Sequence, residues 1–219
     1  MAMYQSSGGA WTDSAATTVG PMTEGAAGIA VIVLTILGLS AISPAVLTSV
    51  ATIIVGAALL VEAANTGLEY SKVNRRMAET GAAQTAELGA DVTVELAAGF
   101  TGIVLGVLAL LAAGSIMHLL PAALIVFGGA MLIAGLSATS VGGMTQSVAG
   151  GQVVVMEADL APARGLQILV GVAAIVLGIL AFVVPAGGTL LMVGLLVVGG
   201  GLLATSANFT QSFIRMLSQ

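Results

Sequence analysis

Cysteine is absent from this 219-residue chain, and charged and aromatic residues make up only 7% and 4% of it. Without cysteine the chain has no disulfide, no Cys-ligated zinc site, no iron–sulfur cluster and no thiol nucleophile. One histidine and ten carboxylates argue against an all-protein transition-metal site, and we expect no metal and no cofactor. Five basic residues and a net charge of −5 give nucleic-acid binding no electrostatic basis.

Hydrophobic residues dominate the composition, at 58%, and the mean hydropathy is +1.13. In an ordinary soluble domain about a quarter of the residues are charged. Here the few charges leave three uncharged stretches of 37, 61 and 50 residues, namely 25–61, 96–156 and 165–214. A membrane-spanning helix needs about 20 apolar residues, so each stretch is long enough to cross twice. We therefore predict an all-α polytopic membrane protein with six transmembrane helices.

An internal repeat divides the chain into three units. The string that begins at Ile32, Ile-Val-Leu-Thr-Ile-Leu, returns in nearly the same form at Ile103 and Ile175, with offsets of 71 and 72 residues. Each copy is followed by a lone proline in the middle of its uncharged stretch. Proline suits a tight turn or the first turn of a following helix. We predict three helical hairpins in a pseudo-threefold arrangement, with hairpin turns at Pro44, Pro121 and Pro185.

The predicted organisation follows from the repeats. The hairpins cover 26–64, 96–139 and 166–207, with spans at 26–42, 45–64, 96–117, 121–139, 166–184 and 187–207. The hairpins are preceded by a polar tail, 1–25, and followed by a tail, 208–219. They are joined by a helical connection, 65–95, and a loop, 140–165. Residues 152–155 of the loop either form a short β-like segment or lie in the headgroup layer.

An even number of crossings puts both termini and both long connections on one side of the membrane. All the charged residues then face that side, including Lys72, Arg75, Arg76, Arg164 and Arg215. The positive-inside rule makes this side the cytoplasm, with both termini inside and the chain in the plasma (inner) membrane. No Lys or Arg precedes the first apolar run, so we expect the first span to be retained instead of cleaved as a signal peptide.

Glycine is abundant, with 30 copies. Small residues mark close helix contacts in membranes, where little hydrophobic force acts between helices. A glycine-lined pore or lipid slot is the alternative. Helix packing is predicted for Gly102, Gly106, Gly194, Gly199, Gly200 and Gly201.

Two acidic residues lie at the edges of predicted spans. Glu62 is 18 residues after Pro44, about 27 Å along a helix. A carboxylate at the membrane interface is usually solvated, whereas one deep in the bilayer marks a functional site. Interface placement is the favoured interpretation, and a proton or ion relay through Glu62 and Glu95 is the alternative. Glu95 also begins a span, where a helix N-terminus favours an acid.

The remaining polar residues of the spans are one histidine and several hydroxyls. His118 lies at the outer turn of the middle hairpin. It is interpreted either as a residue that snorkels to the membrane surface or caps a helix, or as a candidate pH sensor. Intramembrane hydroxyls either line a polar path or bond within their own helix. A Ser/His/Asp triad cannot form, because His118 and the carboxylates lie on opposite faces, and we expect no enzyme. The hydroxyls are Thr35, Ser40, Thr48, Ser49, Thr52, Thr101 and Thr189.

Over about residues 26–207 the chain resembles the HdeD-like family of acid-resistance membrane proteins. The resemblance rests on the three Ile-Val-Leu strings, their prolines at 44, 121 and 185, and glycine-rich second helices around Gly56, Gly128-Gly129 and Gly199-Gly200-Gly201. It implies a bacterial inner-membrane or archaeal plasma-membrane protein linked to acid or general stress. It implies no catalytic residues.

Two function classes remain. The first is a non-enzymatic integral membrane protein of HdeD-like type, which acts structurally or within a larger assembly. The second is a proton, ion or small-solute channel or transporter that uses Glu62 and the intramembrane hydroxyls. The expected partners are membrane lipids and a homo-oligomer or larger membrane complex joined through 65–95 and 140–165, with no nucleic acid.

Overall fold

Every element in the described part of the chain is a helix. The computed structural model describes the backbone of residues 10–40, 43–80, 88–111, 116–145, 161–185 and 187–217, and the side chains of 23–40, 43–68, 92–111, 118–136, 165–185 and 187–206. The helices are α1 (Ala10–Leu39), α2 (Pro44–Thr80), α3 (Leu88–Leu111), α4 (Ile116–Thr145), α5 (Ala161–Val183) and α6 (Gly187–Leu217).

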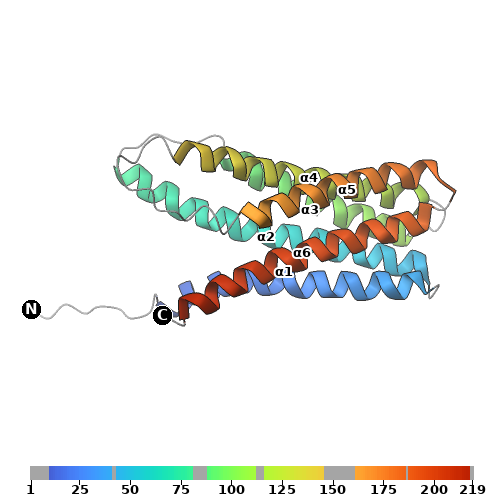
Figure 1. The fold of residues 1–219 in the computed structure, drawn as a ribbon, viewed down its shortest axis with the longest axis horizontal. Coiled ribbons are helices and arrows are strands. Elements are labelled where there is room, and N and C mark those ends of the chain that lie inside the picture. Colours follow the sequence, from blue (N-terminus) through green and yellow to red (C-terminus); the bar gives the residue numbers. More distant parts are fainter. Residues whose placement is uncertain are drawn as a thin grey trace, which may run out of the picture.

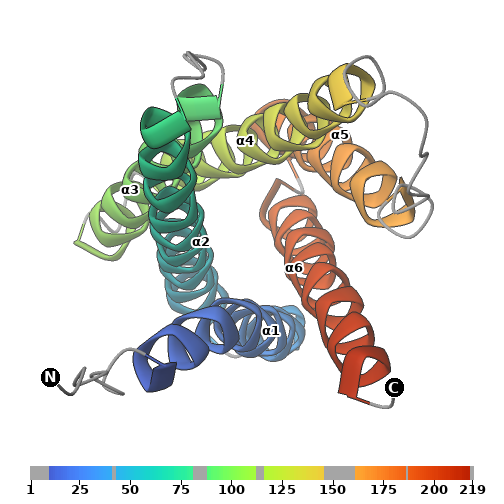
Figure 2. The ribbon, with the colours of Figure 1, turned by 90° about the vertical axis from the view of Figure 1, so that its left-hand side faces the viewer.

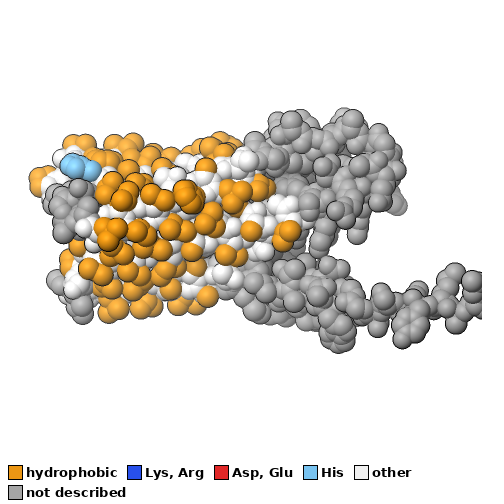
Figure 3. Space-filling view, turned by 180° about the vertical axis from the view of Figure 1, so that it is seen from behind, with side chains coloured by type: hydrophobic (Ala, Val, Ile, Leu, Met, Phe, Trp, Pro, Cys, Tyr) orange, Lys and Arg blue, Asp and Glu red, His pale blue; other side chains and the backbone are white. Residues whose placement is uncertain are grey.

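These helices have the length and surface of a membrane bundle. Five of them contain a stretch long and apolar enough to span a membrane, and α1 contributes the shorter apolar stretch Thr23–Leu39. Large hydrophobic residues are exposed on the outside, among them Leu111 at 78% and Val183 at 76%, a pattern that lipid accommodates and water does not. Figure 3 shows hydrophobic side chains covering the described surface of one face. The predicted six-helix multi-pass bundle is confirmed.

The helices run antiparallel between two ends of the bundle. At the hairpin end, α1, α3 and α5 finish and α2, α4 and α6 begin, whereas the two chain termini lie at the opposite, terminal end (Figure 1). Helix α2 continues to Thr80, as predicted for a helical connection. Helix α4 continues to Thr145 and α5 begins at Ala161, so the segment between them is shorter than the predicted loop 140–165. The β-like segment at 152–155 lies outside the described residues.

The six helices form a closed ring with three inner and three outer members. The inner helices α2, α4 and α6, the second helix of each hairpin, contact one another. Each outer helix packs against the inner helix of its own hairpin and, more extensively, against that of the preceding hairpin: α3 on α2, α5 on α4, and α1 on α6. The contact of α1 with α6 closes the ring around a common axis (Figure 2). This is the predicted pseudo-threefold arrangement.

Each extensive outer–inner contact is centred on a pair of glycines. A Cβ atom added to Gly56 would lie 2.7 Å from the carbonyl oxygen of Gly99, and one added to Gly128 would lie 2.6 Å from that of Gly171. No side chain fits at these distances, so the backbones of the paired helices touch. The members recur at offsets of 71 or 72 residues, the same spacing as the repeated string. The pairs are Gly28–Gly199, Gly99–Gly56 and Gly171–Gly128.

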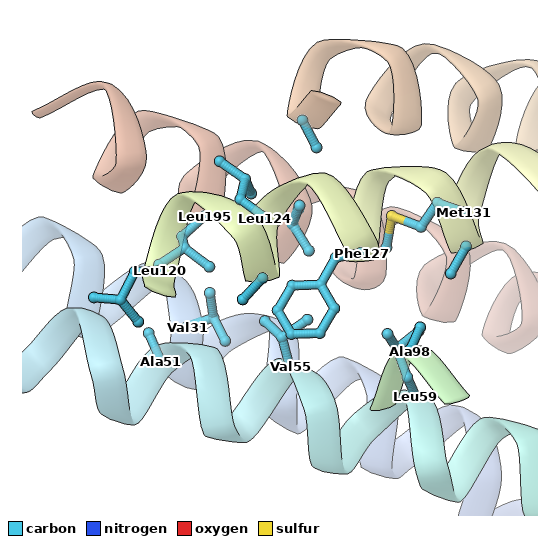
Figure 4. Packing of buried hydrophobic residues seen from close by; sticks show 14 of the residues in the cluster. Val31, Ala51, Val55, Leu59, Ala98, Leu120, Leu124, Phe127, Met131 and Leu195 are labelled. Carbon is cyan, nitrogen blue, oxygen red and sulfur yellow. The ribbon is translucent and has the colours of Figure 1, made fainter. Parts of the chain in front are cut away.

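Apolar side chains fill the space inside the ring. Phe127 on α4 is fully buried and points towards Val55 and Leu59 on α2 (Figure 4). Gly102 on α3 leaves the room that the Phe127 ring occupies, because a Cβ atom there would overlap the ring. Leu124 and Leu195 continue the core towards the hairpin end.

The three prolines occupy different positions, and one prediction is wrong. Pro44 is the first residue of α2, preceded by Ser43 at a φ of 42°, and Pro185 lies in the turn between α5 and α6. Pro121 lies inside α4, five residues after its start at Ile116, and is not at a hairpin turn. The repeat offset explains this, because the residue 72 positions after Pro44 is Ile116. The helix therefore begins at the equivalent place in the repeat, and Pro121 falls in its second turn.

The glycine pair at 128 and 129 offers a test of the close backbone contact. We expect Gly128→Ala to destabilise the bundle by about 1–3 kcal/mol, since overpacking a tight contact costs that much. An added Cβ on Gly129 meets nothing within 4 Å. Gly129→Ala should therefore be neutral or stabilising by up to about 1 kcal/mol through helix propensity. Thermal unfolding in detergent measures both, and equal effects of the two substitutions would contradict the contact.

A candidate carboxyl cluster at the terminal end

Polar residues occupy one equivalent position in the three outer helices. Glu24 on α1, Glu95 on α3 and Gln167 on α5 are separated by 71 and 72 residues, the spacing of the repeat. Each lies four residues, about one helical turn, before the contact glycine of its helix. They therefore share the face that the glycine presses against an inner helix. The repeat places three polar side chains at one level of the bundle.

Three carboxyl groups come together at this level. Glu24 and Glu95 are buried, at 7% and 6% exposure, and Glu62 on α2 is half-buried. The side chains of Glu24 and Glu62 are hydrogen-bonded to each other, and Glu95 is close enough to interact electrostatically with Glu24. Helices α1, α2 and α3 thus contribute one carboxyl group each to a cluster, called here the carboxyl cluster.

The chemistry of the carboxyl cluster follows from the contact between Glu24 and Glu62. An ionised carboxylate only accepts hydrogen bonds, so a hydrogen bond between two carboxyl groups requires a proton on one of them. Two carboxylates at one site cannot both ionise without strong repulsion. The arrangement can therefore take up a proton between Glu24 and Glu62.

Sequence reasoning found two of the three members. Glu62 and Glu95 were singled out, but the favoured placement in a solvated interface is wrong for Glu95, which is buried. Glu24 was missed because it was assigned to the polar tail 1–25, whereas α1 begins at Ala10. The 71-residue offset between Glu24 and Glu95 is the signal that identifies it.

Glu62 also faces a pocket. The pocket is a small, partly open space of about 10 Å³, about the room that one water molecule needs, and it lies between α2, α4, α5 and α6. Its other polar lining residues are Gln167 and Thr205, and the remainder of the lining is Met131, Val170, Gly201 and Leu202. Glu62 thus belongs both to the carboxyl cluster and to the lining of this pocket.

The buried hydroxyls do not continue from the cluster as a polar path. Thr35 donates to the carbonyl of Val31, and Thr48 donates to that of Pro44 at 2.5 Å. Ser49 and Thr52 also donate to carbonyls four residues earlier in α2. These bonds within single helices are the favoured interpretation from the sequence, and they leave the hydroxyls as local helix contacts.

His118 lies far from the carboxyl cluster. It is exposed near the start of α4, at the hairpin end, and stacks on Phe182 of α5 with ring centroids 6.1 Å apart and an interplanar angle of 13°. The carboxyl cluster is at the other end of the bundle, so the two do not form one constellation. Among the described side chains, no group of three or more His, Cys, Asp and Glu residues is arranged to hold a metal ion.

Five of the six glycines predicted to pack do so. An added Cβ would overlap Phe127 at Gly102 and Leu124 at Gly194, and would lie 2.6 Å from Ile53 at Gly106. At Gly199 and Gly201 it would lie 2.9 Å from Val31 and from Val170. Gly200 is the exception: nothing lies within 4 Å, so the prediction that it packs is wrong. Helical rotation turns Gly199 towards α1 and Gly201 towards α5, and Gly200 faces elsewhere.

Comparison of the chain with protein-family models, curated proteins and solved structures found no match.

The carboxyl pair predicts how stability depends on pH. Raising the pH removes the proton shared by Glu24 and Glu62, so two adjacent charges remain and the bundle loses stability. Glu24→Gln keeps a hydrogen-bonding group but removes one charge. We expect this variant to lose less stability between neutral and alkaline pH than the unsubstituted protein, by about 1–3 kcal/mol, the cost of a buried polar group that loses its partner.

Thermal unfolding in detergent over a pH series measures the effect. Glu157→Gln, which changes a carboxyl group in the sequence between α4 and α5, is the control and should keep the original pH dependence. An identical alkaline loss of stability in Glu24→Gln and in the control would show that the pair does not hold a shared proton.

Proposed function

We propose that this chain is a non-enzymatic integral membrane protein of the HdeD-like, acid-stress type, whose packed bundle responds to protons through the carboxyl cluster. The observation that carries the proposal is the hydrogen-bonded pair of buried Glu24 and half-buried Glu62, with Glu95 beside Glu24. Ionisable residues within membrane helices are costly and are associated with function. Three of them at one level are a feature that a purely structural bundle does not need.

Acid sensitivity is the expected consequence of placing three carboxyl groups together. The pair already shares one proton, so further protons bind to the groups that are still charged as the pH falls. Each added proton reduces repulsion among α1, α2 and α3 at the terminal end. Acidification therefore tightens the packing of these three helices, and this links the cluster to the stress role implied by the family resemblance.

The location and partners of the protein belong to the same proposal. The basic residues are confined to the terminal side, which favours a cytoplasmic terminal end in a plasma or inner membrane under the positive-inside rule. The apolar outer face favours lipid as the surrounding partner. A homo-oligomer or larger complex joined through 65–95 and 140–165 remains part of the proposal.

A proton channel is the second candidate, and the carboxyl cluster is the observation that favours it. Its weakness lies between the cluster and the hairpin end, where fully buried apolar side chains occupy the ring and the hydroxyls bond within their own helices. The apolar side chains are Leu59, Leu120, Leu124, Phe127, Leu195, Val55 and Val198. This packing supports proton binding at the cluster without passage through the bundle.

Infrared difference spectroscopy tests proton binding directly. The carbonyl stretch of protonated carboxyl groups should increase in the reconstituted protein as the pH falls. Part of this signal should be lost in each of the variants Glu24→Gln, Glu62→Gln and Glu95→Gln. The control variant Glu157→Gln should keep the signal of the cluster groups. A pH-dependent signal that is unchanged in all three cluster variants would overturn the proposal.

Proton flux into liposomes separates the two candidates. We expect liposomes that contain the protein to stay as tight to protons as empty ones when the external pH is lowered, because the apolar core blocks a path. Glu62→Gln should insert and fold normally and should not change the flux. A flux that rises with protein density and is abolished by Glu62→Gln would favour the channel instead.

A further inference from the structure

The carboxyl cluster is reached through one of its members. Glu24 and Glu95 are buried, at 7% and 6% exposure, whereas Glu62 is half-buried. Glu62 is also the cluster member that lines the pocket between α2, α4, α5 and α6. Among the described side chains, Glu62 is therefore where solvent meets the cluster.

Three polar side chains in the pocket wall suit a water molecule. Gln167 carries both hydrogen-bond donors and an acceptor. The Thr205 hydroxyl donates to backbone carbonyls of its own helix, at 2.9 Å to Leu202 and 3.2 Å to Gly201, so its oxygen is left to accept. A water molecule needs two to four polar partners to be held in a buried site, and Glu62, Gln167 and Thr205 supply them.

The pocket lies at the level of the carboxyl cluster, and the apolar core fills the ring from there towards the hairpin end. Glu62 is 18 residues into α2, about 27 Å from the hairpin end. Gln167 comes early in α5 and Thr205 comes late in α6, which places them near the terminal end as well. Towards the hairpin end, Phe127 and Leu59 fill the ring. Access to Glu62 is therefore from the terminal end.

We propose that this pocket is the entry port through which water and protons reach the carboxyl cluster, with Gln167 and Thr205 holding the water that contacts Glu62. A proton passes from this water to the Glu62 carboxylate, and the hydrogen bond between Glu62 and Glu24 carries the exchange into the buried pair. Glu24 of α1 faces Glu62, Glu95 of α3 interacts electrostatically with Glu24, and the described lining residues from α4, α5 and α6 do not titrate. The inference rests on the proposed proton binding.

Hydrogen–deuterium exchange of the protonated carboxyl groups tests the port. The reconstituted protein is moved from H₂O to D₂O, and the rate of the isotope shift in the carboxyl carbonyl stretch is followed. Thr205→Leu fills the pocket, and Gln167→Leu removes a water partner with little change in volume. We expect each to slow the exchange by about tenfold or more, which corresponds to about 1.4 kcal/mol of added barrier.

Thr189→Leu is the matched control, since Thr189 is exposed on the same helix at the hairpin end. It should leave the exchange rate unchanged. Thermal unfolding of all three variants identifies any variant that fails to fold. Because the two port variants change different residues, either one can test the port if the other does not fold. If the carboxyl signal titrates with pH but exchanges at the original rate in Thr205→Leu and Gln167→Leu, the port is wrong and the proposed function stands. If no cluster signal titrates, the proposed function itself fails.

Discussion

Direct contact between helix backbones at three glycine pairs is the constraint on which the rest of the structure depends. Lipid tails are as apolar as leucine, so membrane helices gain association energy mainly by approaching closely enough to pack. The pairs Gly28–Gly199, Gly99–Gly56 and Gly171–Gly128 provide that approach once in each repeat. Because each pair fixes the axial position of an outer helix on an inner one, residues at a fixed distance from the glycine reach the same level. The residue one turn before it is Glu24, Glu95 or Gln167, so the polar layer follows from the packing.

The threefold pattern is broken where the chemistry lies. Glu62 of α2 has Ala134 as its equivalent in α4 and Thr205 as its equivalent in α6, at offsets of 72 and 71 residues. The side of the ring formed by α1, α2 and α3 therefore carries three carboxyl groups, whereas the α5 and α6 side carries an amide and a hydroxyl. Small residues there, Thr205 and Gly201, leave the space that becomes the pocket beside Glu62. Three copies of one hairpin thus give a single asymmetric carboxyl cluster.

Much of the fold could be predicted from the sequence, because long apolar stretches and the charged residues between them mark the membrane spans. These signals extend over many residues and do not depend on any single one. Local errors arose where single residues were interpreted without their place in the repeat. The sequence pattern predicts a turn at Pro121, although the equivalent of Pro44 is Ile116, and it predicts a contact at Gly200, which stands between two glycines that do pack. The carboxyl cluster could be predicted only in part. The pairing of Glu24 with Glu62 joins two helices, so local sequence does not show it. The 71-residue spacing from Glu24 to Glu95 is the sequence signal that identifies Glu24.

The position of Glu24 places the proposed proton binding beside the contact that closes the ring. Helix α1 is held in place partly by α6, the helix farthest from it in the sequence. Its contact glycine, Gly28, is one turn from Glu24. A charge buried in an apolar bundle is expensive unless it is neutralised or paired, so the proposed shared proton lowers the cost of keeping Glu24 inside. Loss of that proton therefore leaves an unfavourable charge one helical turn from the contact between α1 and α6. This contact closes the ring, and it joins the first and third repeats, which are not consecutive in the chain.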